Sequence, residues 1–471
     1  MLIEEKHKKK IENEKIIFQK KLYIQSYGCA MNFSDSEVVA SILKKEGYAI
    51  TNNSNEANLI LINTCSIREK AEQTVRKRIK EFKKNKQSNR NLTIGILGCM
   101  AERLKSKFLE EEKLVDLVIG PDAYRDLPKL IKETNEGRKA VNVILSKEET
   151  YAGINPVRLN SNGVTAFVSI TRGCDNMCSF CVVPFTRGRE RSRDPQSILN
   201  EILTLNKSGY KEVTLLGQNV DSYLWFGGGA KKDFLKKNDK ERQNHINFAK
   251  LLEMIAVNNK NMRIRFSTSN PQDMKNEVLK TIAKYHNICN YIHLPVQSGS
   301  SKILKLMNRG HSREWYLERI KTIYKHIPDC GLSSDFITGF CDETEEDHQL
   351  TLSLMEEVKY HFSYMFYYSE RPNTYAQRKL KDNIPEKIKK RRLQEIIDLQ
   401  HKHSLHRNKM CVGKIFEVLI EGDSKKSNKE FYGRTPQNTV VVFKKLNHQI
   451  GDFVNVKITD CTSATLIGKT I

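Results

Sequence analysis

Short apolar runs followed by amphipathic stretches recur along most of the chain. Strands are predicted at 22–27, 59–64 and 92–97, and helices at 66–82 and 100–109. This alternation favours a parallel sheet, because a helix can return the chain so that the next strand runs in the same direction. Ligands bind beyond the carboxyl ends of such strands, so segments that follow each strand are candidate site segments.

The same rhythm continues in the middle of the chain and predicts six β–α units. A helix is expected at 195–208, after the first of these strands. Six such units predict a partial (β/α) barrel with its site at the carboxyl ends of the strands. The predicted strands are 166–170, 212–216, 263–267, 291–294, 333–337 and 364–367.

The last 60 or so residues change to short alternating strands separated by turns. Turns are predicted at 421–423 and 451–452. This pattern indicates a small β-barrel, so the fold class is α/β with an added all-β module. The predicted strands are 413–420, 430–434, 439–443, 453–460 and 464–468.

Two further stretches interrupt the pattern. Residues 226–247 combine three glycines with a charged run, and we expect a solvated surface loop that can overhang the site. Residues 378–409 are strongly basic and carry apolar positions at helical spacing. We expect a helix there whose basic side either contacts RNA phosphates or forms a solvated charged face.

Three cysteines stand close together at Cys174, Cys178 and Cys181. The CxxxCxxC spacing lets three thiolates ligate one cuboidal iron–sulfur cluster and leaves the fourth iron open for substrate. The alternative is three unrelated core cysteines. The spacing favours the cluster.

A second set of cysteines follows the predicted strands of the first domain: Cys29, Cys65 and Cys99. All three would lie at one sheet edge, where they could hold a second cluster with an open iron. The alternative is that each is a small buried residue at the end of a strand. Four other cysteines show no ligand spacing and are expected to be packing or surface residues; they are Cys289, Cys330, Cys411 and Cys461.

Composition and charge suggest which kind of partner the protein binds and in which compartment it is found. Among 471 residues, 79 Lys and Arg against 56 Asp and Glu give a net charge of +23. Nucleic acid is the first candidate partner, although compositional drift toward Lys would give the same excess. The start of the chain has no apolar signal core, and no run is long enough to span a membrane. We therefore expect a cytoplasmic protein with reduced thiols and no membrane partner.

Several short segments resemble those of known families. Residues 171–193, which contain the cysteine triplet, resemble the signature of radical S-adenosylmethionine (SAM) enzymes. Residues 28–32, 63–72 and 98–103 resemble the methylthiotransferases, which are radical SAM enzymes with an auxiliary cluster in an N-terminal domain. The likeness to the methylthiotransferases continues through 171–193, 215–220 and 293–300 and covers roughly residues 21–471. Within this group the chain is most similar to the branch that acts on isopentenyl-adenosine in tRNA.

This resemblance implies two 4Fe–4S clusters and SAM as cofactors. The auxiliary cluster would be held by Cys29, Cys65 and Cys99, and the SAM-binding cluster by Cys174, Cys178 and Cys181. Residues expected to bind SAM are Phe180, Gln218, Asn219, Ser267, Gln297 and Ser298, although any of the polar ones could be an ordinary turn or capping residue. The family form has Pro-Gly at positions 341–342, where this chain has Cys-Asp, so Cys341 is not expected to be a ligand.

The last unit resembles the TRAM domain, an OB-like RNA-binding module, through residues 433–435 and 438–441. Arg434, Lys444 and Lys445 are the candidate phosphate contacts, with ordinary surface charge as the alternative. Four arginines that alternate after the triplet either steer RNA or the SAM carboxylate or have partners within the protein; they are Arg187, Arg189, Arg191 and Arg193.

These parts predict a domain order. It is a Lys-rich tail at 1–20, a methylthiotransferase domain at 21–140, a radical SAM core at 160–390, a basic helix at 391–407 and a TRAM domain at 408–471.

The expected reaction adds a methylthio group to carbon 2 of isopentenyl-adenosine next to the anticodon. The expected partners are the tRNA anticodon arm, a sulfur donor and an electron donor such as flavodoxin or ferredoxin. The protein itself is expected to be a monomer. Alternatives are methylthiolation of threonylcarbamoyl-adenosine in tRNA or of a ribosomal protein, and a non-enzymatic iron–sulfur RNA-binding sensor.

Overall fold

The computed structural model describes residues 20–65 and 69–471. The described residues form two compact units, one made of residues up to 146 with 153–159 and the other of residues 147–152 with 160–471. The predicted Lys-rich tail, apart from its last residue, and the start of the helix predicted at 66–82 lie outside the described residues.

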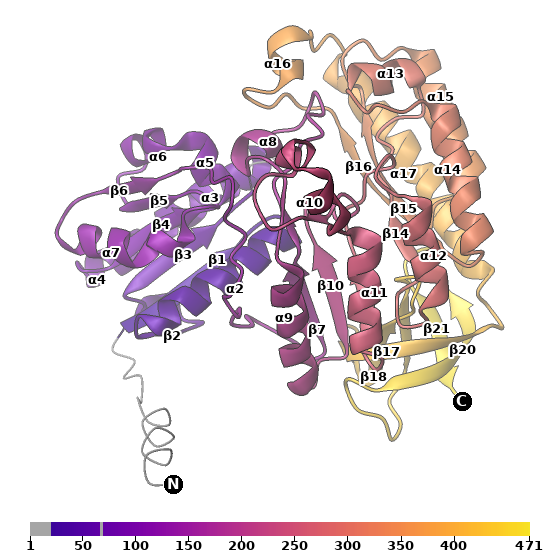
Figure 1. Cartoon of the computed structure of the whole chain (residues 1–471), viewed down its shortest axis with the longest axis horizontal. Helices are drawn as coiled ribbons and strands as arrows, with labels where there is room; N and C mark the ends of the chain where they lie inside the picture. Colours follow the sequence, from indigo (N-terminus) through magenta and orange to yellow (C-terminus); the bar gives the residue numbers. More distant parts are fainter. Residues whose placement is uncertain (1–19, 66–68) are drawn as a thin grey trace. The chain divides into compact units, whose positions relative to one another are not determined.

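The first unit is a parallel sheet of six strands in the order β2-β1-β3-β4-β5-β6 (Figure 1). Every neighbouring pair runs parallel, which confirms the predicted arrangement. The central strands β3 and β4 are buried along their whole length, as expected for a sheet covered on both faces. The strands are β1 Lys20–Ser26, β2 Tyr48–Ile50, β3 Leu59–Asn63, β4 Thr93–Leu97, β5 Leu117–Ile119 and β6 Ala140–Asn142.

Helices connect these strands, and one of them differs from the prediction. The single helix expected at 100–109 is two short helices, because Lys105 has a φ of 52° and breaks the hydrogen-bond ladder. The other predicted helix is present as α3 over its described part. The helices are α2 Ala30–Lys45, α3 Glu69–Glu81, α4 Lys83–Ser88, α5 Cys99–Leu104, α6 Ser106–Glu111 and α7 Leu127–Asn135, with 3-10 turns at Ser54–Glu56 and Tyr124–Asp126.

The second unit begins with a core of two three-stranded parallel sheets, β7-β10-β13 and β14-β15-β16. Backbone hydrogen bonds join them: the N–H of Ile264 donates to the carbonyl of Asn287 at 2.7 Å, and that of Ser269 to His293 at 3.3 Å. The six strands therefore form one continuous arc, which confirms the partial barrel. They are β7 Thr165–Ser169, β10 Glu212–Leu216, β13 Arg263–Phe266, β14 Tyr291–His293, β15 Gly331–Thr338 and β16 Phe362–Tyr367.

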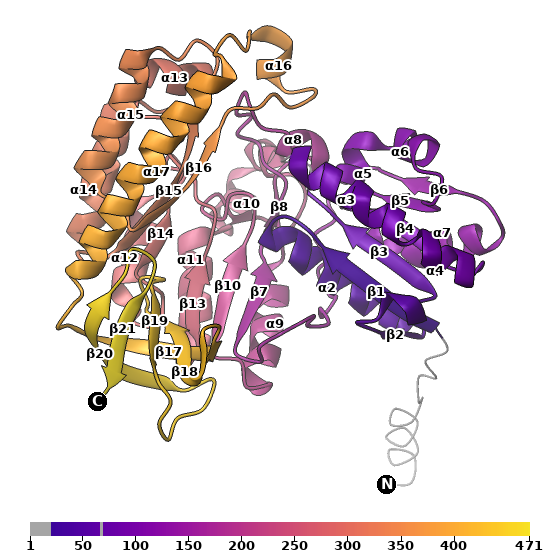
Figure 2. The same ribbon diagram turned by 180° about the vertical axis from the view of Figure 1, so that it is seen from behind.

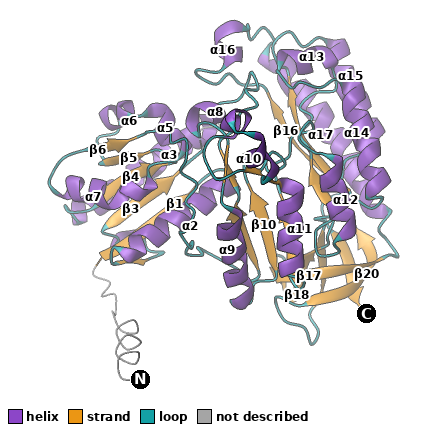
Figure 3. Ribbon diagram, viewed as in Figure 1, coloured by secondary structure: helices purple, strands orange, loops and turns teal. Residues whose placement is uncertain are grey.

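Helices lie outside this arc of strands (Figure 3). Their apolar faces and the strands share one large core of buried residues. They are α9 Pro195–Lys207, α11 Phe248–Asn258, α12 Asn276–Lys284, α13 Ser301–Leu306, α14 Arg313–His326, α15 Glu345–Val358 and α17 Glu386–Lys409, with short helices α8 Val183–Thr186 and α16 Tyr375–Lys379.

The basic segment after residue 378 belongs to the core. Helix α17 lies against β16 and α15 (Figure 2), and Ile396 on its inner face is fully buried. Several of its cations form ion pairs within the unit: Lys389 with Asp382 at 2.6 Å, and Arg392 with Glu343 at 2.9 Å. These two cations are buried, so for them neither sequence interpretation, RNA contact or a solvated charged face, is correct.

The charged insertion is more ordered than predicted. Its ends pair as the antiparallel strands β11 Leu224–Trp225 and β12 Ile246–Asn247, and its middle holds a 3-10 helix at Lys231–Lys236 and α10 at Asp239–Gln243. The ring of Phe234 lies between Phe226 and His245, with centroids 5.4 and 5.5 Å away. A small aromatic cluster therefore organises a segment whose composition resembles that of a solvated loop.

The C-terminal strands close into a barrel in the order β17-β18-β19-β21-β20. This confirms the small β-barrel but corrects one turn, because residues 421–423 continue β17 through a bulge and do not end it. The turn predicted at 451–452 is present. The strands are β17 Ile415–Ser424, β18 Ser427–Arg434, β19 Val440–Lys444, β20 Phe453–Cys461 and β21 Leu466–Thr470.

This barrel is fixed against the amino end of the core strands through buried charges. Arg265 of β13 pairs with Glu212 of β10 at 3.0 Å and donates to the backbone carbonyls of Thr435 and Pro436. The backbone is also closely packed there, since an added Cβ at Gly331 would lie 2.6 Å from the carbonyl oxygen of Gln437. The loop between β18 and β19 therefore closes this end of the partial barrel.

Candidate metal centres

The loop that carries the cysteine triplet starts directly after β7. Its two ends pair as an antiparallel ribbon, β8 Thr171–Arg172 with β9 Arg191–Ser192. Gly173 has a φ of 77°, and an added Cβ there would lie 2.1 Å from the carbonyl oxygen of Arg189. The ribbon thus needs glycine at this position, and it holds the triplet at the carboxyl end of the core strands.

The three thiols of this loop lie near one another. Burial raises the pKa of the Cys174 thiol, and the thiols of Cys181 and Cys178 raise it further. Three neighbouring, partly buried thiols are poor anions by themselves, but a bound metal deprotonates its cysteine ligands outright. The donor set and its burial therefore fit a metal cluster.

A second segment, residues 306–309 at the end of α13, makes hydrogen bonds to the triplet loop. The N–H of Ser179 donates to the carbonyl of Met307 at 3.0 Å, its hydroxyl to the carbonyl of Leu306 at 2.8 Å, and Asn308 donates to the carbonyl of Met177 at 3.0 Å. Sequence reasoning missed this segment. The only local signal for it is an Asn-Arg-Gly turn, in which Asn308 and Gly310 both have positive φ.

Gln218 and Asn219 follow β10 and lie beside the start of the triplet loop, since the hydroxyl of Thr171 donates to the carbonyl of Asn219 at 3.4 Å. The residue before them, Gly217, has no room for a side chain, because an added Cβ would lie 1.9 Å from the Thr171 hydroxyl. Asn219 donates to Asp273 at 2.6 Å, whereas its amide oxygen and that of Gln218 are buried and have no hydrogen-bond partner among the described residues. Two buried acceptors without partners favour a ligand that supplies donors.

The other predicted SAM contacts divide into two kinds. Thr268, next to Ser267, and Gln297 have φ values of 73° and 78°, and such backbone strain tends to occur at functional sites. Ser298, by contrast, is used internally, since its hydroxyl accepts from the N–H of Ser300 at 3.2 Å and lies 3.4 Å from the hydroxyl of Thr351. Ser267 lies 3.2 Å from the hydroxyl of Thr268.

Phe180 packs into a small apolar cluster beside the triplet. Its ring meets that of Phe340 edge-on, with centroids 6.4 Å apart. Cys341 is fully buried in the same cluster, which also contains Tyr368 and Met307. Burial raises the pKa of the Cys341 thiol, so it behaves as a packing residue.

The alternating arginines after the triplet have partners within the protein. Arg191 is fully buried and donates to the backbone carbonyls of Glu149, Arg187 and Arg189. Arg193 pairs with the buried carboxylate of Glu201 at 2.5 Å, and Arg189 lies 3.3 Å from Asp175. Arg189, Arg191 and Arg193 therefore match the second of the two expectations, that these arginines have partners within the protein.

The charged insertion is attached to the exit of the triplet loop. The N–H of Lys231 donates to the carbonyl of Glu190 at 2.7 Å, and its ammonium pairs with the Glu190 carboxylate at 3.0 Å. Glu190 is 1 % exposed, and burial raises its pKa. The insertion is therefore held against the exit of the triplet loop.

The second set of cysteines gathers at one edge of the six-stranded sheet. Cys29 is the N-cap of α2, Cys65 follows β3, and Cys99 is the first residue of α5. An added Cβ at Gly28 would lie 2.4 Å from the Cβ of Cys65, and the N–H after Cys99 donates to the carbonyl before Cys65 at 3.3 Å. The three segments converge, so their donor set also fits a cluster.

Polar groups order this edge. The side chain of Asn63 donates to the carbonyl of Asn32 at 2.8 Å and to the hydroxyl of Ser36 at 3.0 Å, which ties β3 to α2. Burial raises the pKa of Glu102, in α5, to about 7. Its carboxylate oxygen Oε2 is buried and has no hydrogen-bond partner among the described residues.

The remaining cysteines are apart from these two sets in the fold. Cys289 and Cys330 are buried at the start of β14 and β15, and Cys411 and Cys461 pack on the C-terminal barrel. Burial raises the pKa of all four thiols. They behave as the packing residues that the sequence predicted.

The predicted phosphate contacts lie on the C-terminal barrel. The Arg434 guanidinium is 3.9 Å from the Glu421 carboxylate, and its side chain is 41 % exposed. Lys445 pairs with Asp423 at 2.6 Å and lies over the ring of Phe431. Lys444 is exposed.

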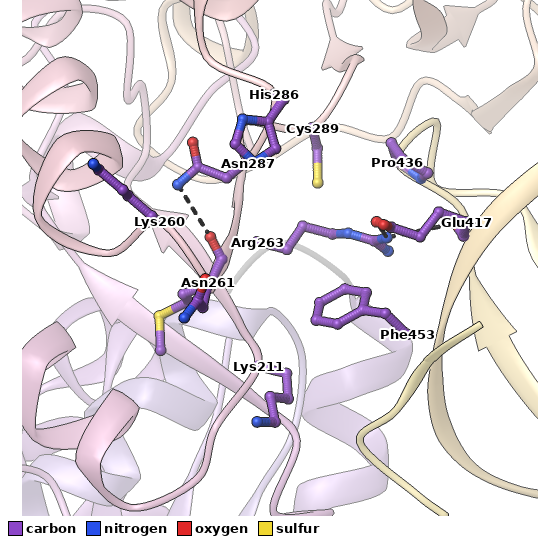
Figure 4. A pocket seen from close by; sticks show the side chains of 11 residues that line it. Lys211, Lys260, Asn261, Arg263, His286, Asn287, Cys289, Glu417, Pro436 and Phe453 are labelled. Atoms are coloured by element: carbon purple, nitrogen blue, oxygen red, sulfur yellow. Dashed lines mark hydrogen bonds and ion pairs between the residues drawn. The ribbon is translucent and has the colours of Figure 1, made fainter. Parts of the chain in front are cut away.

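A groove of mixed polar and apolar lining lies between this barrel and the core at the amino end of the strands (Figure 4). It has a volume of about 340 Å³. The buried Arg263 pairs with Glu417 at 3.0 Å and lies over the ring of Phe453. Lys211 and Lys260 are exposed at its rim. The groove therefore combines an aromatic ring with an excess of positive charge.

No helix among the described residues is long and apolar enough to cross a membrane. Three families match successive parts of the chain. They are "Uncharacterized protein family UPF0004" on residues 21–120, the Radical SAM superfamily on residues 168–355 and the TRAM domain on residues 409–471.

The core has the fold of known radical SAM proteins. The solved structure of the radical S-adenosylmethionine methyltransferase TsrM from Kitasatospora setae matches with a TM-score of 0.54 at 13% identity, over 85% of this chain and 78% of that chain. With the superfamily match, the partial barrel and its cysteine loop define a radical SAM enzyme. Membership of this superfamily implies SAM and a 4Fe–4S cluster as cofactors.

Relatives along nearly the whole chain give the particular family. The tRNA-2-methylthio-N6-dimethylallyladenosine synthase of Christiangramia forsetii is 68% identical over 96% of this chain and 94% of its own length. That of Bacteroides thetaiotaomicron is 52% identical over 96% of both chains. The chain belongs to this family, the MiaB-type radical SAM methylthiotransferases.

Proposed function

We propose that this chain adds a methylthio group to carbon 2 of isopentenyl-adenosine, the N6-dimethylallyladenosine of its relatives' names, in the anticodon arm of tRNA. The observation that carries the proposal is the cysteine triplet held at the carboxyl end of the core strands, in a chain 68% identical to such a synthase. Carbon 2 of adenine is not acidic enough for deprotonation, so the reaction needs a cofactor that supplies a radical.

In this proposal the core residues bind and orient the first cofactors. Cys174, Cys178 and Cys181 hold the cluster that binds SAM. When bound, this cluster and SAM would supply the radical that breaks the C–H bond. The buried amide oxygens of Gln218 and Asn219 accept hydrogen bonds from SAM. Phe180, Ser267, Gln297 and Ser298 shape the same site.

The N-terminal unit supplies the sulfur in this proposal. Cys29, Cys65 and Cys99 would hold a second 4Fe–4S cluster, which would supply the sulfur, and one SAM molecule would supply the methyl group. The cysteines follow the ends of three neighbouring strands of one sheet, which supports a shared site. The reaction consumes sulfur and electrons, so a sulfur donor and a one-electron donor such as flavodoxin or ferredoxin are partners. The protein acts as a monomer in the cytoplasm, where tRNA is found.

The deciding experiment is mass spectrometry of tRNA nucleosides from cells with and without this gene. Deletion should remove the methylthio group completely and let isopentenyl-adenosine accumulate, because the substrate is formed but not consumed. Loss of the methylthio group from threonylcarbamoyl-adenosine, or from a ribosomal protein with tRNA unchanged, would refute this substrate. Unchanged products in both would indicate a non-enzymatic iron–sulfur protein.

We further propose that the groove of Figure 4 contacts RNA phosphates outside the anticodon loop. It lies at the amino end of the core strands, whereas the triplet lies at their carboxyl end. Lys211 and Lys260 bring positive charge to a rim formed partly by the RNA-binding type of barrel. RNA that enters the site with its loop must extend along the core to reach this groove, so its stem or body makes the contact.

Reversing both groove charges, by Lys211→Glu with Lys260→Glu, is expected to weaken binding of full-length tRNA about tenfold. Each lost phosphate contact also lowers the slope of log Kd against log salt by about 1. Fluorescence anisotropy at several salt concentrations measures both quantities. The matched control is Lys321→Glu with Lys325→Glu, two exposed lysines on α14. An equal loss in both pairs would mean that only net charge matters.

A further inference from the structure

A buried arginine lies against one cysteine of the triplet. Nη1 of Arg309 donates to Sγ of Cys178 at 3.3 Å, and Nη2 donates to the carbonyl of Pro295 at 2.7 Å. The arginine is only 7 % exposed, so its charge is little screened by solvent. Its Nε is buried and has no hydrogen-bond partner among the described residues. Burial of a guanidinium without a carboxylate partner is costly, which favours a functional role for its position.

The backbone around Arg309 fixes that position. The N–H of Arg309 donates to the carbonyl of Leu304 at 2.9 Å, which closes the end of α13. Residues 306–308 make three further hydrogen bonds to residues 177–179, on both sides of Cys178. The contact between the guanidinium and the thiol therefore belongs to a set of hydrogen bonds that joins two distant segments. Arg309 and Cys178 are 131 positions apart in the sequence.

We propose that Arg309 is a positioning residue that orients Cys178 and raises the reduction potential of the cluster bound by the triplet. The inference rests on the proposed role of Cys178 as a ligand. An N–H donated to a cysteine sulfur, and a fixed positive charge beside it, stabilise the more negative, reduced state. One electron from the donor protein enters the cluster, and no covalent bond is made or broken in this step.

The arginine suits this role better than other cations would. Its guanidinium stays protonated at all physiological pH values, so its effect on the potential is constant with pH. Its fork also binds two acceptors at once, here a sulfur and a backbone carbonyl, which holds the charge at one place. A lysine would keep the charge but not this double contact.

The test is a potentiometric titration of the reduced cluster, followed by electron paramagnetic resonance, on the reconstituted full chain. For Arg309→Met we expect about a tenfold lower ratio of reduced to oxidised cluster at a given poise, which is 59 mV for one electron. Arg309→Lys should lower the ratio less. To observe one cluster only, the titration is repeated in a chain with Cys29, Cys65 and Cys99 replaced by Ala.

The matched control is Arg313→Met, which removes a nearby arginine that donates to the carbonyl of Gly299 at 3.4 Å. It should leave the potential unchanged. An unchanged potential in Arg309→Met with full iron content would overturn the inference and leave the proposed function intact. If Arg309→Met loses iron, the potential of Arg309→Lys is measured instead. A potential equal to that of the wild-type chain would then overturn the inference. A wild-type chain that binds no cluster at the triplet would instead overturn the proposed function.

Discussion

Replacing Cys174, Cys178 or Cys181 by Ala should abolish formation of 5′-deoxyadenosine from SAM, a loss of at least about a thousandfold. The reason is that the cofactor carries the chemistry, and two of the three thiolates cannot hold the cluster in its place. The assay is chromatography of SAM cleavage products under reducing conditions, together with the iron content of the reconstituted protein.

The control for these variants is Cys341→Ala. Cys341 is fully buried beside Phe180, so its replacement disturbs packing near the triplet without removing a proposed ligand. This variant should keep its iron and its SAM cleavage. Normal cleavage by any one of the three triplet variants would refute the assigned role of that cysteine.

Replacing Cys29, Cys65 or Cys99 by Ala should separate the two halves of the reaction. SAM cleavage should persist, because the triplet is intact, whereas the methylthio product should disappear. Iron content should fall by about four atoms per chain, the content of one 4Fe–4S cluster. Nucleoside mass spectrometry of tRNA and the cleavage assay measure the two halves on the same sample.

Cys330→Ala serves as the comparison for this set. Cys330 is buried just before β15, far along the chain from the N-terminal cysteines, and is not a proposed ligand. Both activities should survive its loss. If a variant of Cys29, Cys65 or Cys99 still forms the methylthio product at the normal rate, the second cluster has no part in the mechanism.

Periodicity predicted three strands of the N-terminal sheet, the six core strands and the strands of the C-terminal barrel, but it missed the three-residue strands β2, β5 and β6. The signal of the predicted strands is a run of four to eight apolar residues, which depends on local composition alone. It failed where one residue breaks an element, as at Lys105, or where a bulge extends a strand, as at residues 421–423. Neither feature changes the hydrophobic pattern, so neither can be seen in it.

Charge was the least predictable property. The basic stretch at 378–409 and the arginines after the triplet suggest RNA, but Arg392, Arg191 and Arg193 all have buried partners within the protein. Conversely, Lys211 and Lys260 carry no sequence signal, and the fold places them together at one groove. The role of a charged side chain depends on the groups that it contacts, and those groups are often distant in the sequence.

By itself the sequence determined the fold class, the order of the domains and both sets of candidate ligands. Covalent spacing sets the reach of Cys174, Cys178 and Cys181, and strand ends of a parallel sheet necessarily share an edge. Only the tertiary structure showed that the guanidinium of Arg309 donates to the sulfur of Cys178. It also showed that the C-terminal barrel closes the amino end of the core. Those contacts join residues more than a hundred positions apart, and long-range packing decides them.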